Sequence, residues 1–259
     1  MKRFILLSMI VIAALFLSSF VNAQSSYGLC VGLSKCGIVG HPEYDSAPPS
    51  NDAISLKKVL AKQGFKVGAV TNKHANRQNI IKRLRALASA PKSSNDKIIF
   101  FMASHGSEDG FLLTYGGEAI SYNEIMDILS TSKTKHIYCF IMACGSGSVA
   151  NSMQADPNWS KNASKWGITF MTSCRPEETS KAFTLPHWKH SLYGQALIKG
   201  FRGQADVDGN RQITLMELFK YTYNEVTGRM NGTENVAGDV QHPQLIGPKS
   251  EHDSVLAKW

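Results

Sequence analysis

The sequence predicts an α/β domain with a mostly parallel central sheet and helices on both faces. Short apolar segments alternate along the chain with longer amphipathic segments. The apolar segments are hydrophobic almost throughout, which is typical of strands that are covered on both faces of a sheet. Regular alternation of strands and helices favours parallel strands joined by right-handed crossovers.

Five segments are predicted strands because each is a short, bounded run of apolar residues. They are YGLCVGL (27–33), FKVGAV (65–70), IIFFMA (98–103), IYCFIMA (137–143) and GITFMT (167–172).

Five amphipathic segments are predicted helices, and their ends carry capping signals. They occupy residues 51–64, 76–91, 121–130, 191–201 and 215–226. The first begins at an Asn-Asp cap and stops at Gly64, and the second stops before Pro91. Ser121 and Glu124 form a predicted capping box at the start of the third.

Two segments depart from the alternation. The pair Gly116-Gly117 predicts a hairpin within the third crossover. Residues 145–166 are rich in Ser, Asn and Gly and have no periodicity, so they are predicted to form a long mobile loop. A loop of this length inside a compact domain is usually functional or a cleavage site.

Residues 1–23 are predicted to be a cleaved secretory signal. Lys2 and Arg3 precede an apolar core, and small residues end at Ala23. A retained anchor is the less favoured alternative, because the core is shorter than the ~20 residues that a membrane span needs. We expect export to the periplasm or the extracellular space without a stable membrane anchor. Residues 24–259 are predicted to form a single domain.

The charge pattern argues against a nucleic-acid partner. The chain has 28 Lys and Arg residues against 20 Asp and Glu, but the excess is scattered and is not interleaved with aromatic residues. The sequence gives no prediction of the oligomeric state.

The cysteines leave the disulfide pattern open. An exported protein meets oxidising conditions, yet five cysteines leave at least one thiol unpaired if all bridges are intramolecular. Cys30 and Cys139 lie within predicted strands and are expected to be inert core residues. Cys36, Cys144 and Cys174 lie in predicted loops.

Two predicted strands end on residues that can carry chemistry. The third runs into His105-Gly106 and the fourth into Cys144-Gly145. Catalytic groups gather at the carboxyl ends of parallel strands, and neighbouring strands lie about 4.8 Å apart. A thiol attacks a carbonyl as thiolate, and an adjacent imidazole is its usual base. The glycines would let backbone amides turn inward, as an oxyanion hole requires.

Zinc binding is an alternative use of the same residue types. A zinc site would draw on Cys36, His105, Cys144 and Cys174. However, no CxxC or HxxxH spacing supports such a site, so the nucleophile–base pair is favoured.

These motifs resemble the bacterial caspase-like and metacaspase group of cysteine peptidases. ASHG followed by the acidic SEDG, and FIMACGSG after a lysine-rich turn, are the central likenesses. YGLCVGLSKC resembles the first strand of the family, TSCRPEETSKAF its loop after the fifth strand, and the later QHPQ part of its C-terminal signature. The ordered set covers nearly the whole chain after residue 23.

The resemblance implies a caspase–hemoglobinase fold and peptide-bond hydrolysis that needs no cofactor for the chemistry. It makes His105 the general acid/base, Cys144 the nucleophile, and the backbone amides of Gly106 and Cys144 the oxyanion donors. The expected activity is that of a secreted caspase-like cysteine endopeptidase acting on peptides or proteins. The alternative is a catalytically silent caspase-fold module that binds peptides or partner proteins.

Substrate preference is less clearly encoded. Metacaspases usually carry an acidic residue two positions before the nucleophile and caspases a glutamine, whereas this chain has Met142. Met142 is therefore either a substrate-pocket residue or a residue that packs under the strand. Cys174, Glu177 and Glu178 are further candidates to line the cleft, with an ordinary surface loop as the alternative.

A calcium-binding loop is possible between residues 206 and 217. Oxygen-bearing side chains occupy positions 1, 3, 5, 7, 9 and 12 of an EF-hand-like pattern: Asp206, Asp208, Asn210, Gln212, Thr214 and Glu217. Position 6, which is normally glycine, is Arg211. The alternative is an ordinary turn followed by a Thr214–Glu217 capping box.

Overall fold

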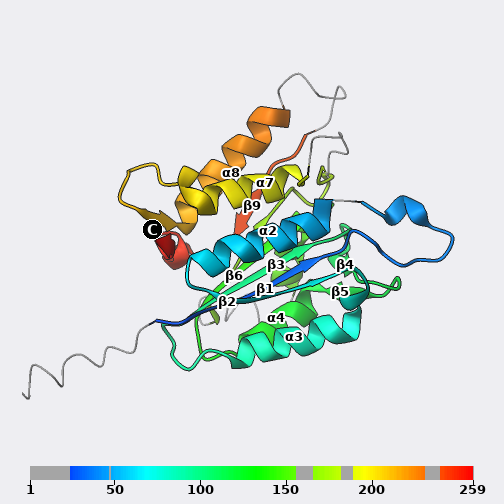
Figure 1. The fold of residues 1–259 in the computed structure, drawn as a ribbon, viewed down its shortest axis with the longest axis horizontal. Coiled ribbons are helices and arrows are strands. Elements are labelled where there is room, and N and C mark those ends of the chain that lie inside the picture. Colours follow the sequence, from blue (N-terminus) through cyan, green and yellow to red (C-terminus); the bar gives the residue numbers. More distant parts are fainter. Residues whose placement is uncertain (1–23, 47, 156–165, 182–188, 231–239, 259) are drawn as a thin grey trace, which may run out of the picture.

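The computed structural model describes residues 24–46, 48–155, 166–181, 189–230 and 240–258; the predicted signal lies outside these residues. Within them, a six-stranded sheet has the order β2-β1-β3-β6-β7-β9 (Figure 1). Its strands are β1 (Ser26–Gly32), β2 (Lys66–Thr71), β3 (Lys97–Ala103), β6 (His136–Met142), β7 (Ile168–Thr172) and β9 (Gln244–Ile246). Only β9 pairs antiparallel to its neighbour.

Helices cover both faces of the sheet, which confirms the predicted α/β class (Figure 1). On one face, a buried cluster joins the sheet to α3 (Arg77–Ser89), α4 (Tyr122–Ser130) and α5 (Val149–Ala155). On the other, a second cluster joins it to α2 (Pro48–Lys62), α7 (Leu192–Lys199) and α8 (Leu215–Met230).

Short elements complete the described chain. The predicted hairpin at Gly116-Gly117 is confirmed: β4 (Phe111–Leu113) pairs antiparallel with β5 (Ala119–Ser121). A second antiparallel pair joins β8 (Gln212–Thr214) to β10 (Val255–Lys258). The helical turns are η1 (Pro42–Tyr44), η2 (Asn72–His74), η3 (Ser146–Ser148), η4 (Gly200–Gln204) and η5 (Lys249–Glu251).

The structure corrects the prediction that residues 145–166 are a loop throughout. Residues 146–155 form η3 and α5, whereas 156–165 lie outside the described residues. Val149 and Met153, four residues apart and therefore on one helix face, are buried in the cluster that contains α4. This burial offsets the weak helix propensity of the polar residues between them.

One predicted helix start and one predicted capping box also need correction. α2 begins three residues earlier than predicted, at Pro48-Pro49, because proline is compatible with a first helical turn. Ser121 caps α4 by accepting from Glu124 N, but the Glu124 carboxylate binds Arg77 instead of completing the box.

No disulfide forms among the cysteines, which are all free thiols. Cys30 and Cys139 are fully buried in the core as predicted, and burial raises the pKa of both thiols. Cys36 and Cys174, predicted in loops, are buried too, whereas Cys144 is half-buried.

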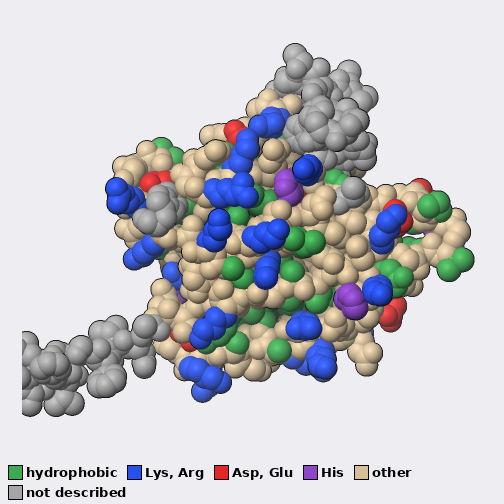
Figure 2. Space-filling model, in the orientation of Figure 1, with side chains coloured by type: hydrophobic (Ala, Val, Ile, Leu, Met, Phe, Trp, Pro, Cys, Tyr) green, Lys and Arg blue, Asp and Glu red, His purple; other side chains and the backbone are tan. Residues whose placement is uncertain are grey.

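The surface agrees with the dispersed charge of the sequence. On the face shown in Figure 2, Lys and Arg side chains are spread over α2 and α3 and are not gathered into one patch. Among the described residues, no helix combines the length and the apolar character that crossing a membrane requires.

A buried polar cluster attaches the C-terminal segment to the amino end of β6. Glu251 Oε2 accepts from His136 Nδ1 at 3.0 Å, from the Tyr138 hydroxyl at 2.7 Å and from Ser254 Oγ at 2.9 Å. Burial alone would raise the pKa of Glu251, but these hydrogen bonds and the His136 charge outweigh it and hold the pKa below its usual value.

We expect Glu251→Gln to lower the free energy of unfolding by about 1–3 kcal/mol at pH 7, because hydrogen bonds to a charged group are lost. Since the folded-state pKa is depressed, this stabilisation is present above the unfolded pKa and is lost as the pH falls through the folded pKa. Urea unfolding at pH 7 and at pH ~3 measures it. The difference in unfolding free energy between Glu251→Gln and wild type should shrink at the lower pH. The exposed-site control Glu118→Gln should have the unfolding free energy of wild type at both pH values.

Candidate active site

The sheet register brings His105 and Cys144 together. β3 and β6 are neighbours in parallel register, with Ala103 opposite Met142 and Ser104 N donating to Met142 O at 3.0 Å. His105 and Cys144 each lie two residues beyond this last pair of the register. The two segments touch: a Cβ built on Gly106 would lie 2.8 Å from Cys144 O. The predicted adjacency of these strand ends is therefore present.

A backbone carbonyl orients the histidine. His105 Nε2 lies 2.7 Å from Tyr44 O, and the two rings meet edge to face at 5.5 Å between centroids. A carbonyl oxygen only accepts, so Nε2 must carry the hydrogen. In the neutral imidazole, Nδ1 is then the unprotonated nitrogen and can accept a proton.

The loop that supplies this carbonyl is itself fixed. The Cys36 thiol donates to Tyr44 O at 3.0 Å, and Cys36 N donates to Asp45 Oδ1 at 2.8 Å. Lys35 Nζ binds the other Asp45 oxygen at 3.1 Å. Burial, and then the Asp45 charge, raise the pKa of Cys36 to about 11, so its sulfur remains a protonated donor at neutral pH.

The Cys144 thiol is contacted by the loop that follows β7. Ser180 N donates to Cys144 Sγ at 3.4 Å. In the described part of the chain, no hydrogen bond joins Cys144 to His105. Catalytic hydrogen bonds are often long in substrate-free enzymes and tighten only when substrate is bound.

Two backbone amides near the sulfur have no acceptor among the described residues: Gly106 N and Cys144 N. Gly145 N differs, because it donates to Glu178 O at 2.9 Å. Gly145 has φ +63°, a left-handed conformation that glycine adopts without strain. Because unpaired amides near a protein interior are rare, an oxyanion or water is their natural partner.

The four predicted pocket residues do not share one surface. Met142 is 3 % exposed and lies in the core cluster beneath α2 and α7. Cys174 is fully buried, and its sulfur lies 3.3 Å from the carbonyl oxygens of both Ala143 and Glu178, either of which can accept its single hydrogen. The Glu178 side chain is buried against His242, which leaves Glu177 as the exposed member of the set.

Comparison with known proteins decides the family. The family model described as the caspase domain matches residues 33–250. The chain belongs to the caspase domain family. Among curated proteins, none matches the sequence.

Solved structures share this fold at low sequence identity. A protein of Geobacter sulfurreducens, GSU0716, has a TM-score of 0.61 and 13% identity, with 89% of this chain and 97% of that chain covered. Caspase-1 from Spodoptera frugiperda has a TM-score of 0.61 and 16% identity, with coverages of 88% and 90%. These likenesses confirm the predicted caspase fold.

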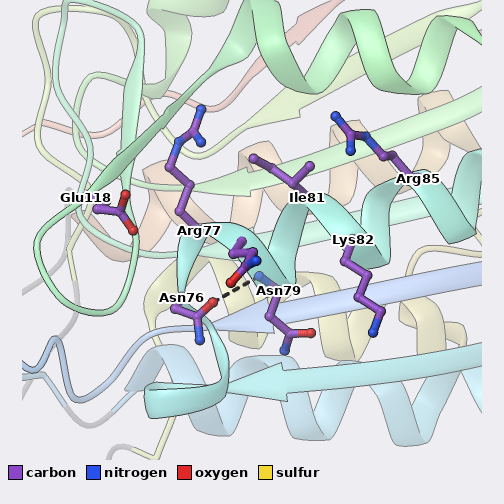
Figure 3. A pocket seen from close by; sticks show the side chains of 8 residues that line it. Asn76, Arg77, Asn79, Ile81, Lys82, Arg85 and Glu118 are labelled. Carbon is purple, nitrogen blue, oxygen red and sulfur yellow. Dashed lines mark hydrogen bonds between the residues drawn. The ribbon is translucent and has the colours of Figure 1, made fainter.

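Two cavities of this caspase domain are lined by residues other than His105 and Cys144. One, of about 770 Å³, lies over the first turns of α3 and is lined by Arg77, Lys82, Arg85 and Glu118 among others (Figure 3). The other, of about 480 Å³, lies between α2 and η4.

Sequence reasoning missed three contributors to the site: Tyr44, Gln241 and His242. Tyr44 acts through its main-chain oxygen, which no side-chain motif reveals. Gln241 and His242 belong to the QHPQ segment, which resembled a family signature but had been assigned no role. Each reaches the site through tertiary contacts with residues more than 55 positions away.

Three of the six residues predicted to bind calcium come together. Carboxylate oxygens of Asp206, Asp208 and Glu217 lie within 4.8 Å of one another. Ca²⁺–oxygen distances are about 2.3–2.6 Å, so this spacing fits one ion between them. Arg211 adopts φ +62°, the conformation for which glycine is normally used, and its N donates to Asp206 Oδ2 at 3.0 Å.

The alternative capping box is also formed. Thr214 Oγ1 accepts from Glu217 N at 3.2 Å, and Thr214 N donates to Glu217 Oε2 at 2.9 Å. The carboxylate of Glu217 thus caps α8. Zinc is not supported, because the described residues bring no cluster of Cys36, His105, Cys144 and Cys174 into metal-binding range.

Calcium binding stays a prediction with a direct measurement. Titration calorimetry of the full chain with CaCl₂ should show one site, and Asp208→Asn should weaken it about tenfold or more through the loss of a charged ligand. Asp109→Asn, an exposed acid outside the loop, is the matched control. No heat of binding at millimolar calcium would contradict the prediction.

Proposed function

We propose that this caspase-family chain is a secreted cysteine endopeptidase that hydrolyses peptide bonds with Cys144 as nucleophile and His105 as general acid/base. The observation that carries the proposal is the register of β3 and β6, which sets His105 beside Cys144 while Tyr44 O holds the imidazole by Nε2. Membership of the caspase domain family supports it.

Each step of the proposed reaction uses a group described above. His105 Nδ1 takes the Cys144 proton, and the sulfur attacks the carbonyl carbon of the scissile peptide. The amides of Gly106 and Cys144 donate to the oxyanion that forms. His105 then protonates the leaving amine as the C–N bond breaks, and a thioester remains on Cys144. Water, deprotonated by His105, hydrolyses the thioester and releases the acid. The chemistry needs no cofactor.

Met142 bears on substrate preference. A buried thioether offers no charge at the position where the resembled metacaspases carry an acid, so this position cannot attract Arg or Lys. Glu177 remains the exposed acidic residue among the pocket candidates.

The proposed location is the periplasm or the extracellular space, on the basis of the predicted signal at residues 1–23. The proposed partners are peptide or protein substrates, with no nucleic acid. Outside the cell a bridge to Cys144 would inactivate the site, and in the structure Cys144, Cys36 and Cys174 are free thiols.

A silent caspase-fold module that binds peptides or proteins is the second candidate. The observation that favours it is that, among the described residues, no hydrogen bond joins Cys144 to His105.

Hydrolysis of a mixed fluorogenic peptide library by residues 24–259 in reducing buffer separates the two candidates. We expect cleavage that Cys144→Ala abolishes while it leaves the fold intact. Absence of cleavage with and without calcium, combined with retained peptide binding by both forms, would support the silent module.

A further inference from the structure

The loop formed by residues 173–181 packs directly on the nucleophile. Glu178 O accepts from Gly145 N at 2.9 Å, and Ser180 N donates to Cys144 Sγ at 3.4 Å. The position of this loop therefore determines both the turn after Cys144 and the hydrogen bond that its sulfur receives.

One buried glutamine joins the two ends of the 173–181 loop. Gln241 Nε2 donates to Ser173 O at 2.9 Å, and Lys181 N donates to Gln241 Oε1 at 2.9 Å. The Gln241 side chain is 1 % exposed, so water does not compete for these bonds. A single amide thus fixes the distance between the first and last residues of the loop.

The next residue holds the middle of the loop. His242 N donates to Glu178 Oε2 at 2.7 Å, and His242 Nδ1 lies 2.6 Å from Glu178 Oε1. Arg175 N also donates to Oε2, at 3.1 Å. Burial would raise the pKa of Glu178, but the bonds from His242 and Arg175 dominate and hold its pKa below the usual value. These contacts occupy both oxygens of the Glu178 carboxylate, so it does not face substrate.

We propose that Gln241 and His242 are positioning residues that hold the 173–181 loop, through Ser173, Glu178 and Lys181, against the nucleophile Cys144. Both residues precede β9, the outer strand of the sheet, which pairs with β7. A chain of contacts therefore connects this outer strand, through the 173–181 loop, to the Cys144 sulfur. The inference rests on the proposed function for its effect on turnover, whereas its effect on thiol reactivity does not.

Alkylation of Cys144 by iodoacetamide, followed by mass spectrometry of the full chain, tests the thiol part. We expect His242→Ala and Gln241→Ala to slow alkylation about 10-fold, because the Ser180 amide no longer donates to the sulfur. His242→Asn, whose amide can replace Nδ1 as donor, should restore most of the rate. His74→Ala and Gln78→Ala, exposed positions on η2 and α3, are the matched controls.

Steady-state kinetics on a cleaved peptide tests the turnover part. Per titrated thiol, kcat should fall about 10–100-fold with KM changed less than about threefold, as for residues that orient a reacting group. A purely structural role would instead lower thermal stability and the folded fraction while kcat per active thiol stayed constant.

The outcomes separate the two proposals. Unchanged alkylation and unchanged kcat in folded His242→Ala and Gln241→Ala would overturn the positioning role. If His242→Ala does not fold, Glu178→Gln makes the same test with the loop's size preserved. If wild type cleaves no peptide, the peptidase proposal fails, and the alkylation rates still decide whether the two residues position Cys144.

Discussion

His105→Ala is expected to lower kcat about 10²–10⁴-fold on any peptide that the wild type cleaves, with little change in KM. The imidazole follows the strand that pairs with the strand leading to Cys144, and Tyr44 O fixes it in the tautomer that leaves Nδ1 able to accept. Removing it leaves the thiol protonated in the encounter with substrate. Initial rates across pH 5–9 measure the loss.

Added imidazole gives this prediction a specific control. It should restore part of the His105→Ala rate in proportion to its neutral form, and it should leave Cys144→Ala inactive. The exposed-site variant His74→Ala should behave as wild type. A His105→Ala protein that retains the full rate would contradict the assignment of this residue as the base.

Gly106→Ala is the second large expected loss, about 10²–10³-fold in kcat, because it disturbs an oxyanion donor. The added Cβ would lie 2.8 Å from Ala143 Cβ and 2.8 Å from Cys144 O. Real Cβ contacts are not this short, so the strand ends must separate, and the amides of Gly106 and Cys144 would move apart with them.

A glycine with open space around it is the matched control for this prediction. A Cβ on Gly68, in the edge strand β2, would meet nothing within 4 Å, so Gly68→Ala should keep full activity. Comparison of thermal unfolding for both variants separates a local loss of geometry from global destabilisation. Unchanged kcat in Gly106→Ala would exclude its amide from the oxyanion hole.

The sheet and the adjacency of the two reactive residues were predictable because their signals are local. Each strand is a continuous apolar run, and each reactive residue directly follows one of them. Parallel pairing of β3 and β6 then brings His105 and Cys144 together without any further information. The hairpin at Gly116-Gly117 was equally local, since both glycines adopt positive φ.

What escaped prediction depends on contacts between distant segments. Residues 149–155 lie in a stretch that was predicted to be a loop, and they become helical because Val149 and Met153 bury against α4. Likewise, Glu178 was a predicted candidate to line the substrate cleft, but its carboxylate is paired with His242. In such cases burial and pairing, which only the fold supplies, decide the role of a residue.

The carbonyl that orients His105 could not be predicted from a pattern of side chains. Tyr44 O is a main-chain atom of η1, 61 residues before His105, and its position depends on the buried Cys36 thiol and on Asp45. The sequence had suggested Cys36 as a partner for a disulfide or a metal. Its observed contact is a hydrogen bond to the carbonyl that orients the histidine.

The most direct test of an activated nucleophile is covalent capture of Cys144. Residues 24–259 are incubated under reducing conditions with a peptidyl acyloxymethyl ketone, whose α-carbon forms a thioether with the attacking sulfur as the carboxylate leaves. Peptide mapping by mass spectrometry should place a single adduct on Cys144, formed much more slowly in His105→Ala. Adducts on Cys36 or Cys174 instead, or labelling of Cys144 at the same rate without His105, would contradict the account.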